Sequence, residues 1–423
     1  MKTLSRSFVK SRGLEVQAAL RNAHIVRLGL SVVCRAGDFV ARPGSQGRGL
    51  RVLAPVVILL ALVSASLFAA PQITTRPQSG RATAAPSVAG NGTIYLGNYK
   101  GTISIIDEAT EKVVGEIPLK AGIPGRITFS NDRSRLYIAD ISYEKVEIVD
   151  REKRESIEVH TLSEGKTKVR IWGMQPDPFD KYLILVIKKY TLNEDHWEIG
   201  PPTLVQYDLA TRKIARTIPW PKDEERERAS VIFSPDGKLM YLFGDDILIY
   251  ETEGFKQVDT WNLAQPLEPG AGRVTFGGLD PFTETPGIYT GLLTMNDPLN
   301  GRRMLGIGRV DLVNKKVDFR PIGPARPLGW AISPDRKRAY GLFQDIGEYE
   351  FWTIDVENGT VLQRQAFAGR PRMGNRVSSN GNIIYIYTAG NTIDYYDATT
   401  LKKLRTLTLD TDMTSFTLVP PKK

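Results

Sequence analysis

The sequence predicts an all-β protein in which one unit of four short antiparallel strands recurs along the chain. Three observations support this. A tyrosine recurs seven times, a run rich in β-branched and aromatic residues follows each tyrosine, and each run closes at an acidic residue. The first and last of these acids are 290 residues apart over six intervals. The mean period of about 48 residues is typical of stacked β-units rather than helical repeats.

Five copies open with a turn, and this turn is clearest at Ser234-Pro235-Asp236-Gly237 and Ser333-Pro334-Asp335. Turn residues of this kind bound strands, and a tyrosine lies five residues beyond the third turn position or its equivalent. Weaker turns stand at Ser130-Asn131-Asp132, Gln175-Pro176-Asp177 and Ser379-Asn380-Gly381, where Asn380 takes the third place. The seven tyrosines are Tyr95, Tyr137, Tyr182, Tyr241, Tyr289, Tyr340 and Tyr385.

An acidic residue closes each run, and the residue directly before this acid is either apolar or a tyrosine. Alternate residues of a strand point to opposite faces, and apolar residues occupy both sets of alternate positions in the run. Both faces of each strand are therefore expected to be covered. Recurrence in every copy indicates that the acids cap turns and do not form a catalytic set. They are Asp107, Asp150, Asp208, Glu251, Asp311, Asp355 and Asp397.

Seven four-stranded sheets that cover one another close as a seven-bladed β-propeller, which we expect over residues 92–423. The first copy, at Thr93, starts at its second strand, and the stretch Thr414–Leu418 is left over after the seventh. We therefore expect this C-terminal strand to complete the N-terminal blade and close the ring.

The N-terminal region predicts export. Residues 1–51 form a basic leader that is longer than the basic start of a usual signal peptide, and we expect that translation truly starts near Leu50. Residues 52–70 carry no charge and fit a signal peptide or a membrane anchor. Residues 71–91 are rich in Pro, Ser, Thr and Ala and are expected to form a flexible linker. The first 70 residues hold ten Lys and Arg against two acids, and the rest holds 46 against 45. A periplasmic or extracellular body without nucleic-acid affinity is expected.

The body offers little chemistry of its own. The only cysteine is Cys34, so thiolate metal sites, cysteine nucleophiles and disulfides are excluded from residues 71–423. No nucleophile elbow, Walker loop or H-E-x-x-H motif occurs, and Asp410-Thr411-Asp412 lacks the spacing of a calcium loop. We predict no catalytic residues, no metal and no cofactor. Carboxylates scattered around a central channel, as in metal-dependent lactonases, remain the enzymatic alternative.

Two connections outgrow their repeat. Tyr182 to Asp208 spans 26 residues and Tyr289 to Asp311 spans 22, whereas Tyr95 to Asp107 needs 12. Both excesses fall between the second and third strands, so both are expected on the same face of the disc. We predict that Tyr190, His196 and Trp197 contact a partner protein there; the alternative is that they cover a blade edge. The mixed-sign run from Lys222 to Arg228 is expected to be a solvated loop.

The motif Ser234-Pro235-Asp236-Gly237-Lys238 with Tyr241 and its siblings resembles YVTN-type propeller repeats over residues 92–419. A closer resemblance, to the β subunit of quinohemoprotein amine dehydrogenase, appears in three segments. They are Lys181–Leu204, which includes Asp195-His196-Trp197, Met304–Lys316 and Asp410–Thr414. The resemblance implies a seven-bladed periplasmic propeller that, like the methylamine dehydrogenase heavy chain, holds a small quinone-bearing subunit without being catalytic. Haem-bearing and quinone-bearing subunits would be its partners. A stand-alone exported repeat protein with an unknown ligand is the alternative.

Overall fold

The computed structural model describes residues 88–220, 225–226, 229–243, 246–262, 274–276, 287–388 and 390–421. The chain divides into two units, Met1–Thr83 and Ala84–Lys423, and all described residues belong to the second. The expected leader, the signal or anchor segment and most of the linker lie outside the described residues. So does most of the charge run, of which only Glu225 and Arg226 are described.

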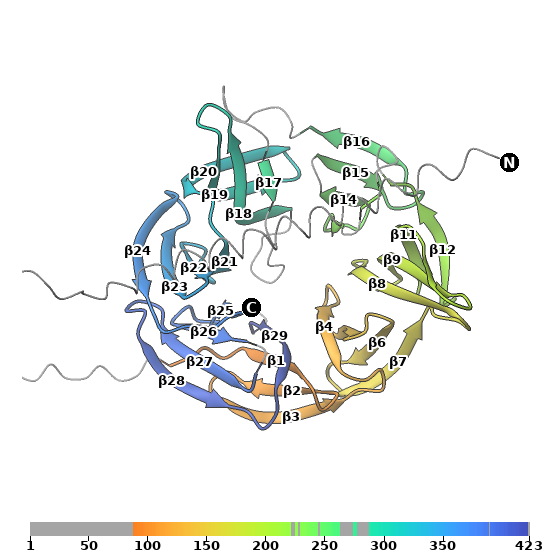
Figure 1. The fold of residues 1–423 in the computed structure, drawn as a ribbon, viewed down its shortest axis with the longest axis horizontal. Helices are drawn as coiled ribbons and strands as arrows, with labels where there is room; N and C mark the ends of the chain where they lie inside the picture. The colour runs from red at the N-terminus through yellow and green to blue at the C-terminus, as the bar shows by residue number, and fades with distance from the viewer. Residues whose placement is uncertain are drawn as a thin grey trace, which may run out of the picture. The chain divides into compact units, whose positions relative to one another are not determined.

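The described strands form seven antiparallel sheets, which follow one another in a ring in chain order (Figure 1). The first sheet has the order β29 (Met413–Val419), β1 (Thr93–Asn98), β2 (Thr102–Asp107) and β3 (Lys112–Pro118), and the second has β4 (Pro124–Phe129), β5 (Arg135–Asp140), β6 (Lys145–Asp150) and β7 (Glu155–Thr161). The third contains β8 (Thr167–Pro176), β9 (Tyr182–Leu192), β11 (Thr203–Asp208) and β12 (Lys213–Ile218), with the short β10 (Trp197–Ile199) beside the end of β9.

Four further sheets complete the ring. The fourth has β13 (Ser230–Phe233), β14 (Leu239–Phe243), β15 (Ile247–Glu251) and β16 (Gln257–Trp261), and the fifth has β17 (Val274–Phe276), β18 (Ile288–Asp297), β19 (Arg302–Asp311) and β20 (Lys316–Pro324). The sixth has β21 (Leu328–Ile332), β22 (Arg338–Asp345), β23 (Glu348–Asp355) and β24 (Thr360–Ala366), and the seventh has β25 (Gly374–Val377), β26 (Ile383–Tyr387), β27 (Thr392–Asp397) and β28 (Lys403–Thr408). The predicted all-β propeller fold is confirmed.

The core lies between sheets rather than inside any one of them. Each cluster of buried side chains draws on two consecutive sheets, for example Tyr137 of β5 with Leu183 of β9, or Tyr340 of β22 with Ile384 of β26. A sheet covered on both faces needs apolar residues at both parities of its middle strands, and β9 shows this as five consecutive buried residues from Leu183 to Ile187. Neighbouring sheets therefore depend on one another for burial.

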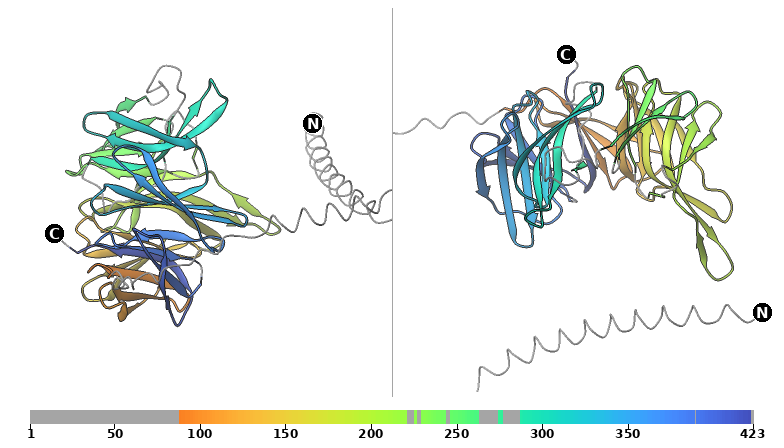
Figure 2. Two further views of the ribbon diagram at one scale, coloured as in Figure 1. Left: turned by 90° about the vertical axis from the view of Figure 1, so that its left-hand side faces the viewer. Right: turned by 90° about the horizontal axis from the view of Figure 1, so that it is seen from above.

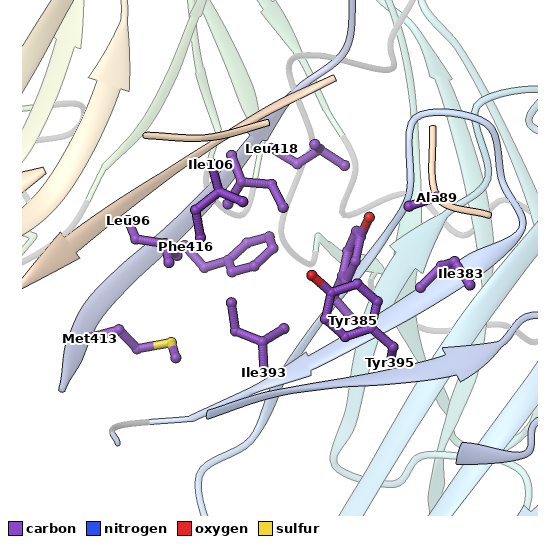
Figure 3. Packing of buried hydrophobic residues seen from close by; sticks show 11 residues of the cluster. Ala89, Leu96, Ile106, Ile383, Tyr385, Ile393, Tyr395, Met413, Phe416 and Leu418 are labelled. Carbon is purple, nitrogen blue, oxygen red and sulfur yellow. The ribbon is translucent and has the colours of Figure 1, made fainter. Parts of the chain in front are cut away.

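The predicted closing strand is present. β29 pairs with β1 in antiparallel register, with Tyr95 opposite Thr417 and Leu96 opposite Phe416. Phe416 and Leu418 pack into a cluster with side chains from the first sheet and from the seventh, among them Tyr385 and Tyr395 (Figure 3). The two ends of the propeller unit thus share one sheet, in which β1 has a paired strand on both sides.

The repeated tyrosines keep one register in five sheets and depart from it in two. Tyr95, Tyr137, Tyr241, Tyr340 and Tyr385 each lie two residues after the partner of the closing acid. Tyr182 instead lies opposite Asp208 itself, and Tyr289 lies one residue after the partner of Asp311. The repeat predicted seven equivalent tyrosines, and this was wrong for Tyr182 and Tyr289, which are not structural equivalents of the other five.

The different register of Tyr182 follows from the position of the turn that precedes it. Ser130 Oγ and Ser234 Oγ accept a hydrogen bond from the backbone N–H five residues later, both at 2.9 Å. In the third sheet Asp177 Oδ1 takes this role for Tyr182 N at 2.9 Å, so Asp177 is the first turn position and not the third. In the seventh sheet the same role belongs to Ser378, one residue before the predicted turn serine.

Six of the seven closing acids, the aspartates, cap turns as predicted. Asp107 Oδ1 accepts from the Thr110 N–H at 2.7 Å, and Asp208 Oδ1 accepts from the Thr211 N–H at 2.7 Å. Hydrogen bonds from Thr110 and Thr211 to the ionised carboxylates lower the pKa of Asp107 and of Asp208. The acids thus stabilise the hairpin between the third and fourth strands.

Candidate functional site: an exposed interaction surface

The insertion in the third sheet forms an antiparallel ribbon that extends beyond the neighbouring sheets, seen as the yellow-green hairpin in Figure 2. β8 and β9 are 10 and 11 residues long, and the outer part of β9 pairs with β8 on one side and with β10 on the other. We call residues 166–170 and 188–199 the arm. The sequence predicted a long loop here, whereas the chain continues the ladder and adds the strand β10.

Register sorts the side chains of the arm onto two faces, because residues directly opposite each other in an antiparallel pair share a face. Tyr190 lies opposite both Lys168 and Ile199, Leu192 lies opposite Trp197, and Lys188 lies opposite Arg170. One face therefore carries four apolar and three cationic side chains. We call it the arm face: Lys168, Arg170, Lys188, Tyr190, Leu192, Trp197 and Ile199.

The arm face is solvent-exposed toward its tip. Trp197 is 45% exposed and Ile199 is 58% exposed, and both lie on the three-residue strand β10. Tyr190 is half-buried because the Arg170 guanidinium lies 5.2 Å from the centre of its ring. Large apolar side chains that remain this exposed on a rigid ladder are available for contact with another molecule.

The three predicted partner-contacting residues do not all lie together. Tyr190 and Trp197 share the arm face, whereas His196 belongs to the turn at the tip. Its Nδ1 lies 2.6 Å from Asp195 Oδ1 and its Nε2 lies 3.1 Å from Asn193 Nδ2, so both ring nitrogens are engaged within the turn. His196 is thus placed to shape the tip, and Leu192 and Ile199 join the two aromatic residues on the arm face.

Exposed apolar residues also stand on other turns that join a second strand to a third. Tyr99 and Ile141 are exposed in the first and second sheets, Leu299 is 84% exposed in the fifth, and Ile346 is 99% exposed in the sixth. Strand direction alternates, so these turns and the arm end at one face of the ring, which we call the hairpin face. Among described residues the opposite turns hold only Phe179 and Val313 as exposed large apolar side chains.

Three of these residues share a sequence pattern that is distinct from the repeated tyrosines and acids. Tyr99, Ile141 and Ile346 each directly follow an Asn or Asp that ends the second strand, at Asn98, Asp140 and Asp345. An apolar side chain at the first position of a polar turn has nothing of its own sheet to cover it. Its recurrence in three sheets indicates a surface property rather than an isolated exposed side chain.

The turn of the second sheet is tied to the base of the arm. The rings of Tyr143 and Trp172 stack with centroids 5.5 Å apart, and the Ile171 N–H donates to Tyr143 O at 2.7 Å. Lys168 Nζ lies 3.2 Å from Glu144 Oε1. Tyr143 has a φ of 61°, a conformation that favours glycine. The equivalent residue in the first sheet is Gly101, whose N–H likewise bonds to the carbonyl oxygen three residues earlier.

Two kinds of site do not occur in the part of the chain that the structure describes. No group of three or more His, Cys, Asp or Glu side chains is arranged to hold a metal ion there. None of these described residues forms a helix that is both long and apolar enough to cross a membrane.

No family model matches the chain, and no curated protein matches it in sequence. Hydrazine synthase of Kuenenia stuttgartiensis is similar in fold, with a TM-score of 0.45 and 13% sequence identity over 79% of this chain and 100% of that chain. The periplasmic gluconolactonase PpgL of Pseudomonas aeruginosa has a TM-score of 0.47 and 13% identity over 78% of this chain and 99% of that chain. The β-propeller domain of Cps50 from Myceliophteria thermophila has a TM-score of 0.46 and 14% identity over 74% of this chain and 95% of that chain. The likeness concerns the fold and transfers no function. The class that the described sheets define is a β-propeller protein.

Proposed function

We propose that this chain is an exported, non-catalytic propeller subunit that binds partner proteins through its hairpin face. The observation that carries the proposal is the arm face, where Leu192, Trp197 and Ile199 are all exposed on a ladder. Ordering such residues costs little on binding because the hydrogen-bonded ribbon already fixes their backbone. Exposed aromatic and aliphatic anchors of this kind dominate the energetics of protein interfaces.

The kind of assembly follows from the resemblance to the β subunit of quinohemoprotein amine dehydrogenase. Of the three resembling segments, residues 181–204 contain the second part of the arm, 188–199, and residues 410–414 contain the connection that leads into β29 at the hairpin face. We therefore propose a periplasmic assembly of the amine-dehydrogenase type, in which haem-bearing and quinone-bearing subunits are the partners. The charge-free segment 52–70 supports export.

The test is co-purification of the full chain from cells that naturally produce it. Trp197→Ala and Ile199→Ala are each expected to lower the yield of associated proteins about tenfold or more, because truncation of a central anchor costs 2 kcal/mol or more, roughly. Leu362→Ala is the matched control, since Leu362 is an exposed aliphatic residue on the outer strand β24. Equal yields from all three variants would remove the binding proposal. Associated proteins that carry neither haem nor quinone would remove the assembly but not the surface.

A further inference from the structure

We propose that the open edge of β10 accepts an extended segment of the partner protein as an added antiparallel strand. In this segment an apolar residue, a Lys or Arg and a second apolar residue follow one another. The inference rests on the proposed function, because it names the binding mode and the chemistry of the partner at the same arm. The partner is then held by the backbone of β10 as well as by the side chains of the arm face.

The hydrogen bonds of the arm show which backbone groups of β10 face away from β9. The Asn193 N–H donates to His196 O and the Gly200 N–H donates to Lys189 O, both at 2.9 Å. Hydrogen-bonded and non-hydrogen-bonded pairs alternate along an antiparallel ladder, so Glu198 is the residue of β10 whose backbone groups face β9. The N–H and C=O groups of its two neighbours in β10 therefore point away from β9.

These four outward groups, two on Trp197 and two on Ile199, form no hydrogen bond with another residue in the described part of the chain. All three residues of β10 are exposed, and β9 already holds them in the extended conformation. Two donors and two acceptors thus alternate along one accessible edge. An incoming antiparallel strand would satisfy all four groups together.

The opposite edge of the arm is covered by the chain itself. β8 lies on that edge, and residues from neighbouring turns accept hydrogen bonds from its outward donors. The Val169 N–H donates to Ser163 Oγ at 2.9 Å, and the Ile171 N–H donates to Tyr143 O at 2.7 Å. The two edges of the arm therefore differ, and β10 is the one that is left open.

The outermost strand of each of the seven sheets has an edge too, but a β-bulge interrupts it. The pairing of this strand with its neighbour shifts by one residue, so one residue of the outermost strand has no partner. Such bulges bend an edge and disrupt its row of donors and acceptors, which hinders strand addition. β10 pairs with β9 without a shift. The bulged residues are Val114, Ile157, Ala215, Val258, Ile322, Leu362 and Leu404.

The side chains of β10 select what the incoming strand carries. Trp197 and Ile199 are exposed on the arm face, so apolar residues are favoured directly opposite them. Glu198 is exposed on the other face and forms no ion pair with another described residue. The residue opposite Glu198 belongs to a non-hydrogen-bonded pair, in which side chains approach most closely, so a Lys or Arg there would compensate the carboxylate.

A second copy of the chain fits this edge poorly. The two-fold axis that lets two copies use all four outward groups places Glu198 of one copy directly opposite Glu198 of the other. Like charges that lie directly opposite each other in a sheet oppose pairing. A different protein with a basic residue at this place meets no such repulsion, so it is the occupant that the charges favour.

Ile199→Pro tests the backbone contact, with Ile199→Ala as its matched control. Both variants lack the isoleucine side chain, but only proline removes the outward N–H and obstructs an added strand. The bonds of Glu198 to β9 remain in both. Benzoylphenylalanine in place of Trp197 in the full chain keeps an aromatic ring there and crosslinks the partner in the producing cells. The dissociation constant of the purified crosslinked protein is then measured for the parent and each variant.

We expect Ile199→Pro to bind about tenfold more weakly than Ile199→Ala, because a hydrogen bond is lost and a carbonyl of the partner keeps no donor. Equal affinities of the two variants would overturn strand addition. Hydrogen exchange of the unsubstituted chain tests the same contact even if Ile199→Pro does not fold. Binding should slow exchange at the amides of Trp197 and Ile199, and unchanged rates at both would also overturn it.

Glu198→Lys tests the basic residue of the partner. Glu194→Lys is its control, because it makes the same change in net charge in the tip turn, outside β10. We expect Glu198→Lys to weaken binding about fivefold, since an attraction becomes a repulsion, and Glu194→Lys to stay within about twofold of the parent. Equal affinities of these two variants would overturn the basic residue.

Two further outcomes separate this inference from the proposed function. A crosslinked second copy of the chain would overturn the occupant proposed here. If Trp197→Ala binds the crosslinked protein as tightly as the parent, the proposed function fails instead, because the apolar anchor is then not used. If no protein is crosslinked, both fail.

Discussion

The hydroxyl of Tyr385 donates a hydrogen bond of 2.8 Å to Glu108 Oε1 across the joint between the seventh and first sheets. The same buried carboxylate accepts from the Gly92 N–H at 2.6 Å and from the Ser379 N–H at 2.9 Å. Burial and the Glu108 charge raise the pKa of Tyr385, so its phenol stays a donor. One carboxylate therefore connects the first sheet, the seventh sheet and the segment that leads into β1.

Loss of this carboxylate should weaken the whole ring. We expect Glu108→Ala to lower the free energy of unfolding by about 3 kcal/mol, because two backbone donors, the phenol and the Ser379 hydroxyl lose their charged acceptor. Glu152→Ala is the control, since Glu152 lies exposed in the corresponding turn of the second sheet. Urea unfolding of the purified chain measures both. An equal loss in the two variants would contradict the role of Glu108.

The closing strand leads to a second prediction. Deletion of the chain from Met413 onward removes Phe416, Leu418 and the ladder partner of β1. Without β29, β1 loses one of its two paired strands and the joint loses buried apolar surface, so we expect the deleted protein to be unfolded or to melt far below the parent. Deletion after Pro420, which leaves β29 complete, should change little. Circular dichroism melting compares the two, and equal melting temperatures would show that closure does not need β29.

The sequence predicted the fold because the fold repeats. A turn serine, a buried strand and a capping acid recur often enough that one error, such as the position of Tyr182, leaves the reading of the other sheets unchanged. The leftover strand at Thr414–Leu418 was recognisable because the first copy starts one strand late, and β29 indeed pairs with β1. The repeat therefore predicts the order of the strands even where a single copy is misaligned.

The candidate surface could be predicted only in part. The excess length of the third copy pointed to Tyr190 and Trp197, but only the register shows that they share a face with Lys168 and Lys188. A loop of unknown conformation has no faces, so the segregation of charge was not accessible from the residues alone. Ile346 was missed because it lies in a turn of normal length, where nothing in the spacing distinguishes it.

Tyr143 offers a test of backbone strain at the hairpin face. Tyr143→Gly relieves a conformation that costs a side chain about 1 kcal/mol, but it also loses the stacking on Trp172, which contributes a similar amount. We therefore expect little net change in the free energy of unfolding. Tyr143→Ala loses the stacking and keeps the strain, so it should be about 1 kcal/mol less stable than Tyr143→Gly.

Gly101→Ala is the matched control for this pair. Its φ is 76°, and an added Cβ would meet nothing closer than Gly122 O at 3.5 Å, so its cost is conformational and not steric. We expect a loss of about 1 kcal/mol. If Tyr143→Gly and Tyr143→Ala are equally stable while Gly101→Ala is destabilised, the φ of Tyr143 does not strain the turn.

His160 provides a prediction about pH. The side chain is buried between the second and third sheets, its Nδ1 lies 2.9 Å from the Tyr207 hydroxyl, and its Nε2 lies 2.8 Å from Glu158 Oε2 without hydrogen-bond geometry. Arg212 pairs with the other oxygen of Glu158, so this carboxylate offers the imidazole little compensation. Burial lowers the pKa of His160 in the folded protein.

Because the pKa of His160 is lower in the folded than in the unfolded chain, the unfolded chain takes up the proton first as the pH falls. Folding stability should therefore decrease as the pH drops through about 6.5, the ordinary value for histidine, and should not depend on this residue above about pH 7.5. His160→Gln removes this titration and should show a shallower loss of melting temperature between about pH 7.5 and about pH 5.5 than the parent. All other titrating groups are common to the two proteins, so the difference between the two slopes reports His160 alone. Identical slopes would mean that the imidazole is not desolvated at this joint.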